Sequence, residues 1–473
     1  MAEEPAPLTI DDPLLRALIV QAPDGWRRLD AAFVLTVTEN LAWMLYSTGT
    51  QEITVEPSEP ILDMVRALRA QAAGSSGEPW WRMELALTEA GECEVNYNYG
   101  ADPFPECRLL SPDAYTADLA AYPRAHVPTW LSAYLGHGDR QRRTPHQAVR
   151  QARRDRANGV WPVLADHEFP PFPVLWARWT TLAAAFTAVR SERGPRMTPW
   201  TGLFEGASGA GATLCVLPHG RAVLSGGIRD APELAAVYND GAPMPELFAG
   251  APDWVADVVL NERAAYGLLS FCYWWDSGRW YRGQSPSAEY CAPALPGVWT
   301  AETVRDLVVG LINGAGGTAR VPAIEALVVA SEMGKVTPTL LSDVFGEGES
   351  WDPDGAWYQY TVAGVAATAP EPIPAARAIG LVREYITGRG LDTTGYPLAD
   401  LIAERFSIGW MIYVPVPAGQ IAIDRAVFYV ADDGTLEHSS SSVAPAEFIT
   451  EFARLFGERH GLEEVGADGP AGV

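Results

Sequence analysis

The stretch from residue 80 to residue 99, WWRMELALTEAGECEVNYNY, constrains the fold more than any other part of the chain. Apolar residues alternate with polar ones on both sides of a turn that contains Gly91. Such alternation predicts two antiparallel strands, because successive side chains of a strand point to opposite faces of the sheet. One face should be buried, and the other should carry the carboxylates of Glu84, Glu92 and Glu94.

Length and composition indicate a folded protein with several domains. The chain has 473 residues, of which 48% are hydrophobic and 20% are charged, and these proportions are typical of globular proteins. No apolar run reaches the roughly 18 residues that a membrane helix needs. The acidic, proline-containing start differs from the basic and apolar start of a signal peptide. We therefore expect no membrane association and a cytoplasmic location.

The net charge of −25 bears on the choice of partner. It results from 59 acidic and 34 basic residues. A strongly acidic surface repels nucleic acid and anionic membranes, and it attracts basic proteins over long distances. Solubility alone would explain the same charge. The expected partner is a basic protein and not a nucleic acid.

Helical and strand patterns follow one another in blocks, which predicts an α+β protein of several domains, each a small, mostly antiparallel sheet packed with helices. Proline-rich segments mark the expected boundaries. The expected divisions are an N-terminal domain (1–137), a linker rich in arginine and proline (138–173), a central α+β domain (174–368) and a C-terminal α-β-β-β-α domain (369–473).

Three further segments carry specific expectations. Seven arginines lie between residues 139 and 156, and we interpret this segment as a solvated linker helix that pairs with the acidic domains. The stretch FGEGESWDPDGAWYQY, residues 345–360, is predicted to be a loop that leads into a strand. In the C-terminal domain, strands are expected at 406–414, 425–430 and 436–442, between helices at 375–387 and 445–459.

The sequence contains no recognisable catalytic or metal-binding constellation. Its five cysteines lack the spacing of a zinc site, and their odd number argues against a complete disulfide framework. None of the seven histidines lies in a nucleophile motif. The glycine-rich run from Gly206 to Gly211 lacks the lysine of a phosphate-binding loop, so we interpret it as a turn. We expect no catalytic residue, metal or cofactor.

The N-terminal elements resemble the YezG-like immunity family over about the first 135 residues. The features that carry the resemblance are Pro23 with Trp26, the helix from Ile61 to Leu68, and a strand pair with Trp80, Leu85, Leu87, Gly91, Tyr97 and Tyr99. The resemblance implies an α+β antitoxin that binds and neutralises the toxin domain of a polymorphic toxin. The family usually has an aspartate directly after the last tyrosine, where this chain has Gly100.

The C-terminal domain is similar to small immunity domains of the YrhB-like group. Its pattern contains the motifs G-W-x-x-Y-x-P from Gly409 and F-Y-V-x-D-D-G from Phe428. This similarity implies a second immunity-type module in the same chain.

These observations lead to one main hypothesis and two alternatives. The main hypothesis is a multi-domain immunity protein that binds a cognate, basic toxin by occlusion, with Glu84, Glu92, Glu94, Asn96 and Asn98 as docking residues. One alternative is an enzyme whose small-molecule pocket in the central domain contains Trp275, Arg279, Trp280 and Arg282. The other alternative is a non-catalytic scaffold protein.

Overall fold

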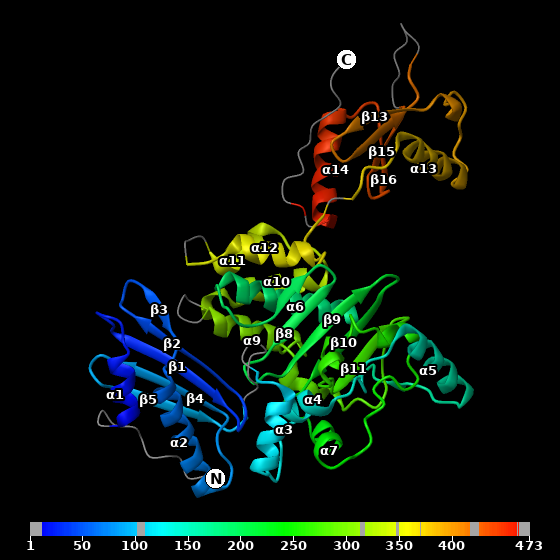
Figure 1. The fold of residues 1–473 in the computed structure, drawn as a ribbon. Helices are drawn as coiled ribbons and strands as arrows, with labels where there is room; N and C mark the ends of the chain where they lie inside the picture. Colours follow the sequence, from blue (N-terminus) through cyan, green and yellow to red (C-terminus); the bar gives the residue numbers. More distant parts are fainter. Residues whose placement is uncertain are drawn as a thin grey trace. The chain divides into compact units, whose positions relative to one another are not determined.

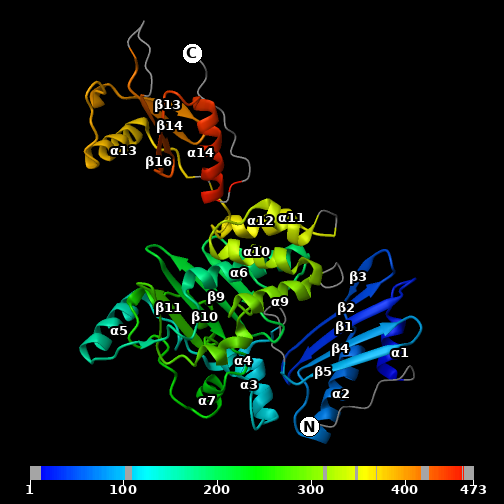
Figure 2. The same cartoon turned by 180° about the vertical axis from the view of Figure 1, so that it is seen from behind.

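The computed structural model describes residues 12–101, 109–312, 317–346, 350–368, 370–416, 425–460 and 462. Within these residues, helices and three antiparallel sheets form an α+β architecture, as the sequence predicts (Figures 1 and 2). Contacts divide the chain into two compact units, 1–169 with 204–295 and 170–203 with 296–473. The boundary expected after residue 137 lies inside the first unit, and the one expected after residue 368 lies inside the second.

The first unit begins with a five-stranded antiparallel sheet of order β3-β2-β1-β4-β5. Its strands are β1 (Arg28–Leu35), β2 (Asn40–Ser47), β3 (Glu52–Val55), β4 (Arg82–Thr88) and β5 (Cys93–Asn98). The predicted hairpin is formed by β4 and β5, in which Leu85 lies opposite Val95. The alternation is confirmed, because Met83, Leu85 and Leu87 are buried and their neighbours in β4 are partly exposed.

Helices α1 (Pro13–Val20) and α2 (Glu59–Ser76) cover one face of this sheet. Three leucines of α1 and the apolar side of α2 pack against the odd-numbered residues of β1, such as Phe33. The Asp12 side chain caps α1 by accepting a hydrogen bond from the Leu14 amide at 2.8 Å. Gly77 ends α2 with a positive φ of 77°.

The opposite face of the sheet is covered only at one end. There, Val34 and Trp81 pack with Tyr115 of α3 (Pro112–Ala121) and Leu131 of α4 (Thr129–Gly136). A buried ion pair between Arg69 of α2 and Asp118 of α3, at 2.7 Å, ties these two helices together. Over the rest of this face, no described helix packs on the strands, and we call this part the open face.

The first unit also contains most of a second, antiparallel sheet, of order β6-β12-β11-β10-β9-β8-β7. Its strands are β6 (Val163–Leu164), β7 (Arg196–Thr198), β8 (Thr201–Glu205), β9 (Gly211–Leu217), β10 (Arg221–Gly227), β11 (Phe271–Asp276) and β12 (Arg279–Arg282). The associated helices are α5 (Pro145–Ala157), α7 (Pro232–Asn239), α8 (Ala288–Cys291) and the short 3-10 helices η2 (Asp253–Ala256), η3 (Glu262–Tyr266) and η4 (Ala292–Ala294). The glycine-rich run before β9 is a turn, as expected.

The arginine-rich segment forms the helix that the sequence predicts, α5, with a complete capping box at Thr144 and Gln147. Ala148 of α5 packs in the same core as Val255 of η2 and Trp274 of β11. This helix therefore packs on the second sheet's core in addition to connecting neighbouring segments.

The second unit has a helical part centred on α6 (Phe172–Ala188), which packs against three other helices. The helices of this part are α9 (Ala301–Leu311), α10 (Val321–Glu332), α11 (Pro338–Phe345), α12 (Pro353–Val362) and the 3-10 helix η5 (Gly317–Arg320). The prediction of a strand near residue 360 is wrong, since this segment forms α12. The Asp352 carboxylate caps it by accepting from the Gly355 amide at 2.9 Å, and Pro353 occupies its first turn.

The C-terminal part of the second unit is a four-stranded antiparallel sheet between two helices (Figure 1). Its elements are α13 (Ala375–Gly388), η6 (Leu398–Asp400), β13 (Ile402–Phe406), β14 (Gly409–Tyr413), β15 (Ala426–Ala431), β16 (Leu436–Ser440) and α14 (Pro445–His460). Met411 packs toward α14, whereas its neighbour Ile412 packs toward α13. The expected three-stranded pattern is wrong, because a two-residue turn after Phe406 adds a fourth strand, β13.

Asp433, in the turn between β15 and β16, links this sheet to α14. Its Oδ2 lies 3.0 Å from Arg459 Nε and 2.9 Å from His460 Nε2, and the Thr435 amide donates to Oδ1 at 2.8 Å. Burial disfavours the charged carboxylate, but hydrogen bonds from His460, Thr435 and Arg459 outweigh this effect and lower the pKa of Asp433 to about 2. The charged carboxylate therefore holds the end of the chain's last helix.

Asp433→Asn is expected to destabilise the C-terminal sheet at pH 7 by about 1–2 kcal/mol. A depressed folded-state pKa stabilises the fold above the unfolded value near 3.8, and this stabilisation is lost as the pH falls toward 2. Hydrogen exchange of β16 and α14 amides should show faster exchange in the variant at pH 7 and a shrinking difference in acid. The exposed Asp400→Asn serves as control, and an equal effect of both variants would contradict this prediction.

Candidate functional site

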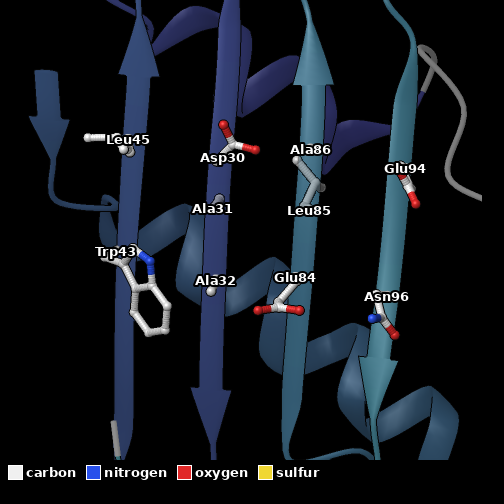
Figure 3. A pocket seen from close by; sticks show the side chains of 10 residues that line it. All are labelled: Asp30, Ala31, Ala32, Trp43, Leu45, Glu84, Leu85, Ala86, Glu94 and Asn96. Carbon is white, nitrogen blue, oxygen red and sulfur yellow. The ribbon is translucent and has the colours of Figure 1, made fainter. Parts of the chain in front are cut away.

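The open face of the N-terminal sheet contains a hollow of about 440 Å³. Figure 3 shows that its side chains come from the four neighbouring strands β2, β1, β4 and β5. Ala32 and Ala86 form the floor in the two central strands. The surrounding side chains are Trp43, Leu45, Asp30, Glu84, Glu94 and Asn96.

Strand register brings these side chains together in two rows. In one row Asp30 of β1 lies opposite Leu45 of β2 and Ala86 of β4, which in turn lies opposite Glu94. In the next row Ala32 lies between Trp43 and Glu84, and Asn96 follows. Cross-strand neighbours are about 5 Å apart. Because the centre of each row has an alanine, the larger side chains stand around a depression.

Two arginines hold carboxylates at the ends of the hollow. Arg28 contacts Asp30 with Nη2 2.7 Å from Oδ1, and Arg82 pairs with Glu84 two residues further along β4. Hydrogen bonding to Asp30 and the charges of Asp30 and Glu94 raise the pKa of Arg28. The exposed Glu94 carboxylate forms no hydrogen bond or ion pair with residues that the structure describes. It is therefore available to a cation from another molecule.

The structure brings together three of the five docking residues predicted from the sequence. Glu84, Glu94 and Asn96 line the hollow. Glu92 is exposed just before β5, outside the lining. Asn98 lies at the other end of β5, where its Oδ1 accepts from the Gly100 amide at 2.7 Å. Its side chain stabilises the turn that follows the strand.

Two important residues of the hollow, Asp30 and Trp43, were not predicted from the sequence. Asp30 stands in the apolar run LDAAFVL, where alternation places it on the same face as Ala32. Trp43 lies in β2 and faces the same side because it pairs with Ala32. The alternation of β1 was a usable signal for Asp30, but Trp43 could be placed only once the register was known.

Gly100, at the position of the family's aspartate, has a structural role here. Its φ is +98°, and its carbonyl oxygen accepts a hydrogen bond from Trp130 Nε1 at 2.9 Å. A Cβ atom at this position would lie 2.6 Å from Cζ3 of Trp81. The backbone conformation and the close indole favour glycine over aspartate at this position.

The four residues of the expected central pocket do not converge. Arg279 and Arg282 are three residues apart in β12, so their side chains point to opposite faces. Trp280 is fully buried and contacts Trp275 edge to face, at 5.4 Å between ring centroids. The segment is a hairpin whose two-residue turn consists of Ser277 and Gly278. The two arginines therefore lie on opposite faces of β12 and do not face one another.

Each of these arginines instead pairs with an acid from the segment before α6. Arg279 Nε lies 3.1 Å from Asp166 Oδ2, and Arg282 Nε lies 2.8 Å from Glu168 Oε1. Glu168 also accepts from Tyr273 OH at 2.8 Å. Although burial opposes it, hydrogen bonds from Arg282 and Tyr273 lower the pKa of Glu168. These contacts connect the segment before α6 to β11 and β12.

The buried thiols of this region are not activated. Burial raises the pKa of Cys291 to about 12, and burial likewise raises the pKa of Cys272. Thiols with raised pKa values are protonated at neutral pH and are poor nucleophiles. Among the described residues, no group of three or more His, Cys, Asp or Glu side chains is placed to hold a metal ion.

Comparisons with known proteins give no further assignment. No protein-family model matches the chain, and no curated protein matches its sequence. In the described ranges, every helix is too short or too polar to cross a bilayer. The open face of the N-terminal sheet is therefore the candidate site on which a functional proposal depends.

Proposed function

We propose that this chain is an immunity protein that binds a basic toxin domain through the open face of its N-terminal sheet and blocks it by occlusion. The observation that carries the proposal is the hollow with an alanine floor, an indole wall at Trp43 and carboxylates at Asp30, Glu84 and Glu94. This combination suits a lysine or arginine side chain. The cation can lie against the indole face and hydrogen-bond to the carboxylates.

The charges of the hollow are arranged to bind a cation from another molecule. Arg28 and Arg82 fix the positions of Asp30 and Glu84 before a partner arrives, which reduces the ordering cost of association. Glu94 remains free to pair with the incoming cation. Exposed ion pairs contribute about 0–1 kcal/mol each, so most of the affinity would come from apolar contact with Trp43 and Leu45.

The resemblance of the N-terminal elements to YezG-like antitoxins supports the same proposal, and the similarity of the C-terminal part to YrhB-like domains suggests a second module. The cytoplasm is the proposed site of action, because an antitoxin has to meet its toxin where the toxin acts. The lack of convergence between Arg279 and Arg282 gives the enzyme alternative no comparable support.

Glu94→Lys is expected to weaken toxin binding about 10- to 100-fold, because it places a cation where the partner's cation would lie. The candidate partners are the toxin domains of secreted proteins encoded beside this chain. Growth rescue on co-expression and calorimetric Kd values measure the effect. Ala86→Gln, which fills the hollow without changing the charge, should weaken binding similarly.

Glu52→Lys is the matched control, since Glu52 is an exposed residue of β3 in the same sheet and outside the hollow. It should leave binding within about twofold of the unmodified protein, because distant surface charges are screened. Equal binding by the Glu94 and Ala86 variants would show that the face is not the contact surface. Failure of the unmodified protein to bind or neutralise any such toxin would refute the proposed function.

A further inference from the structure

A second candidate binding surface lies along α5, away from the N-terminal sheet. One side of this helix borders a groove of about 680 Å³. Arg150 and Arg154, one helical turn apart, lie in its wall, and Glu246 and Gln284 face them from the loops before α8. We call this feature the arginine groove. It is independent of the hollow described above.

The expected pairing of this segment's arginines with acidic domains is wrong for α5, whose arginines have no side-chain partners among the described residues. The guanidinium groups of Arg150 and Arg154, and of Arg153 and Arg156 beside them, form no hydrogen bond or ion pair with any residue that the structure describes. Their positive charges are therefore not paired with a carboxylate in the described ranges.

The nearby carboxylates of the groove are engaged elsewhere. Asp155 Oδ2 accepts a hydrogen bond from the Gly250 amide at 2.9 Å. Glu246 Oε2 lies 3.5 Å from Gln151 Nε2 and 3.9 Å from Arg143 Nη2. Cations in the last turn of a helix interact favourably with the helix dipole. This effect accounts for the presence of Arg154 and Arg156 in the last turn of α5, but it does not account for Arg150.

Exposed apolar residues continue the surface beyond the end of α5. Val160 lines the groove, and the next residue, Trp161, has 72% of its surface exposed. Val163 and Leu164 follow in β6, the edge strand of the second sheet, and are 46% and 40% exposed. Neighbouring tryptophan and arginine side chains are characteristic of the hot spots of protein-binding surfaces.

We infer that the arginine groove binds an extended, acidic segment of another protein, with carboxylates on Arg150 and Arg154 and an apolar residue against Trp161. One turn of helix separates the two arginines by about 6 Å along the axis. Alternate residues of an extended chain are about 6.7 Å apart. A segment with acidic residues at alternate positions therefore matches the spacing.

The chemistry of the groove favours a protein over a nucleic acid. A phosphodiester chain carries a charge at every nucleotide and would place one beside Glu246. A peptide can place uncharged residues opposite Glu246 and Val160. The groove is thus suited to separated carboxylates with apolar residues between them.

The test uses the whole protein and three fluorescein-labelled probes in anisotropy titrations. These are a twelve-residue peptide with glutamate at alternate positions and a central tryptophan, the same peptide with glutamine for glutamate, and a twelve-nucleotide single-stranded DNA. The glutamate peptide should bind, and binding should weaken at least tenfold with Arg150→Glu/Arg154→Glu. Trp161→Ala should also weaken it, and added salt should weaken it further.

Arg153→Glu/Arg156→Glu is the matched control, because it makes the same charge change on the same helix outside the groove lining. It should weaken binding by much less than the groove variant. An equal loss in both double variants, or equal binding of the glutamine peptide, would overturn the inference. Tighter binding of the DNA than of the glutamate peptide would assign the groove to nucleic acid instead, and no binding of any probe would also refute it. Circular dichroism of each variant verifies that the fold is retained.

Discussion

Asp118→Ala is expected to lower the free energy of unfolding of the N-terminal part by about 3–5 kcal/mol. The two side chains of its ion pair are almost completely buried, at 6% exposure for Arg69 and 1% for Asp118. Arg69 Nη2 donates to both carboxylate oxygens, at 2.9 Å and 2.7 Å. Asp118 also accepts from Trp81 Nε1 at 2.7 Å and from the Val37 amide at 3.0 Å. Removal of the carboxylate leaves the buried Arg69 cation without its counter-ion, and it leaves the Trp81 and Val37 donors without this acceptor.

Urea denaturation followed by tryptophan fluorescence and by hydrogen exchange of α2 and β4 measures this loss. Asp113→Ala is the control, because Asp113 is an exposed carboxylate in the first turn of the same helix. Its loss should be below about 1 kcal/mol, the usual size of a helix-dipole contribution. A loss no larger for Asp118→Ala than for Asp113→Ala would mean that the buried pair adds nothing to stability.

Gly100→Asp is expected to destabilise the same region by about 2–4 kcal/mol, from positive-φ strain together with overpacking. A Cβ at this position would lie 2.6 Å from Trp81 and 3.0 Å from Pro128, and the backbone φ is +98°. Trp81 cannot move away easily, because its Nε1 is bonded to Asp118 and Arg124 lies 3.4 Å over its ring. This substitution would introduce the residue expected after Tyr99 if the proposed relation to YezG-like antitoxins holds.

The contribution of the clash can be separated from that of the backbone by two alanine variants. Gly77→Ala has a similar positive φ of 77° but no heavy atom within 4 Å of the added Cβ, so it should cost only about 1 kcal/mol. Gly100→Ala should cost clearly more in the same denaturation experiment. Equal losses for the two alanine variants would show that Trp81 adjusts freely.

Local patterns predicted many elements correctly. The alternation of residues 82–98 identified β4 and β5, and Pro60 with the apolar spacing that follows it identified most of α2. The helix end expected at Gly74 is wrong, because α2 continues to Ser76 and is capped by Gly77. These signals are strong because an amphipathic element has to match its residue period to one buried face. The same reasoning predicted α5 from a sequence that contains only a short apolar side.

Local patterns predicted the wrong element where a segment fits both the two-residue period of a strand and the 3.6-residue period of a helix. Residues 358–361 alternate aromatic and polar side chains, which suggests a strand, yet Ala356, Gln359 and Tyr360 are buried with helical spacing in α12. The cap at Asp352 decides the outcome, because it satisfies an amide of the first helical turn. In the C-terminal sheet, a continuous apolar run concealed the turn between β13 and β14.

The hairpin of β4 and β5 shows which part of the candidate site follows from the sequence and which part follows from the tertiary structure. The sequence alone determined that Glu84, Glu94 and Asn96 share an exposed face, because residue parity fixes the face of a strand. Only the tertiary structure decided that Asp30 and Trp43 join them, since cross-strand register depends on pairing between distant segments. It also paired Arg279 with Asp166 and Arg282 with Glu168, and it left the guanidinium groups of Arg150 and Arg154 without a partner among the described residues. Such neighbours are chosen by packing of the whole chain, which no local pattern records.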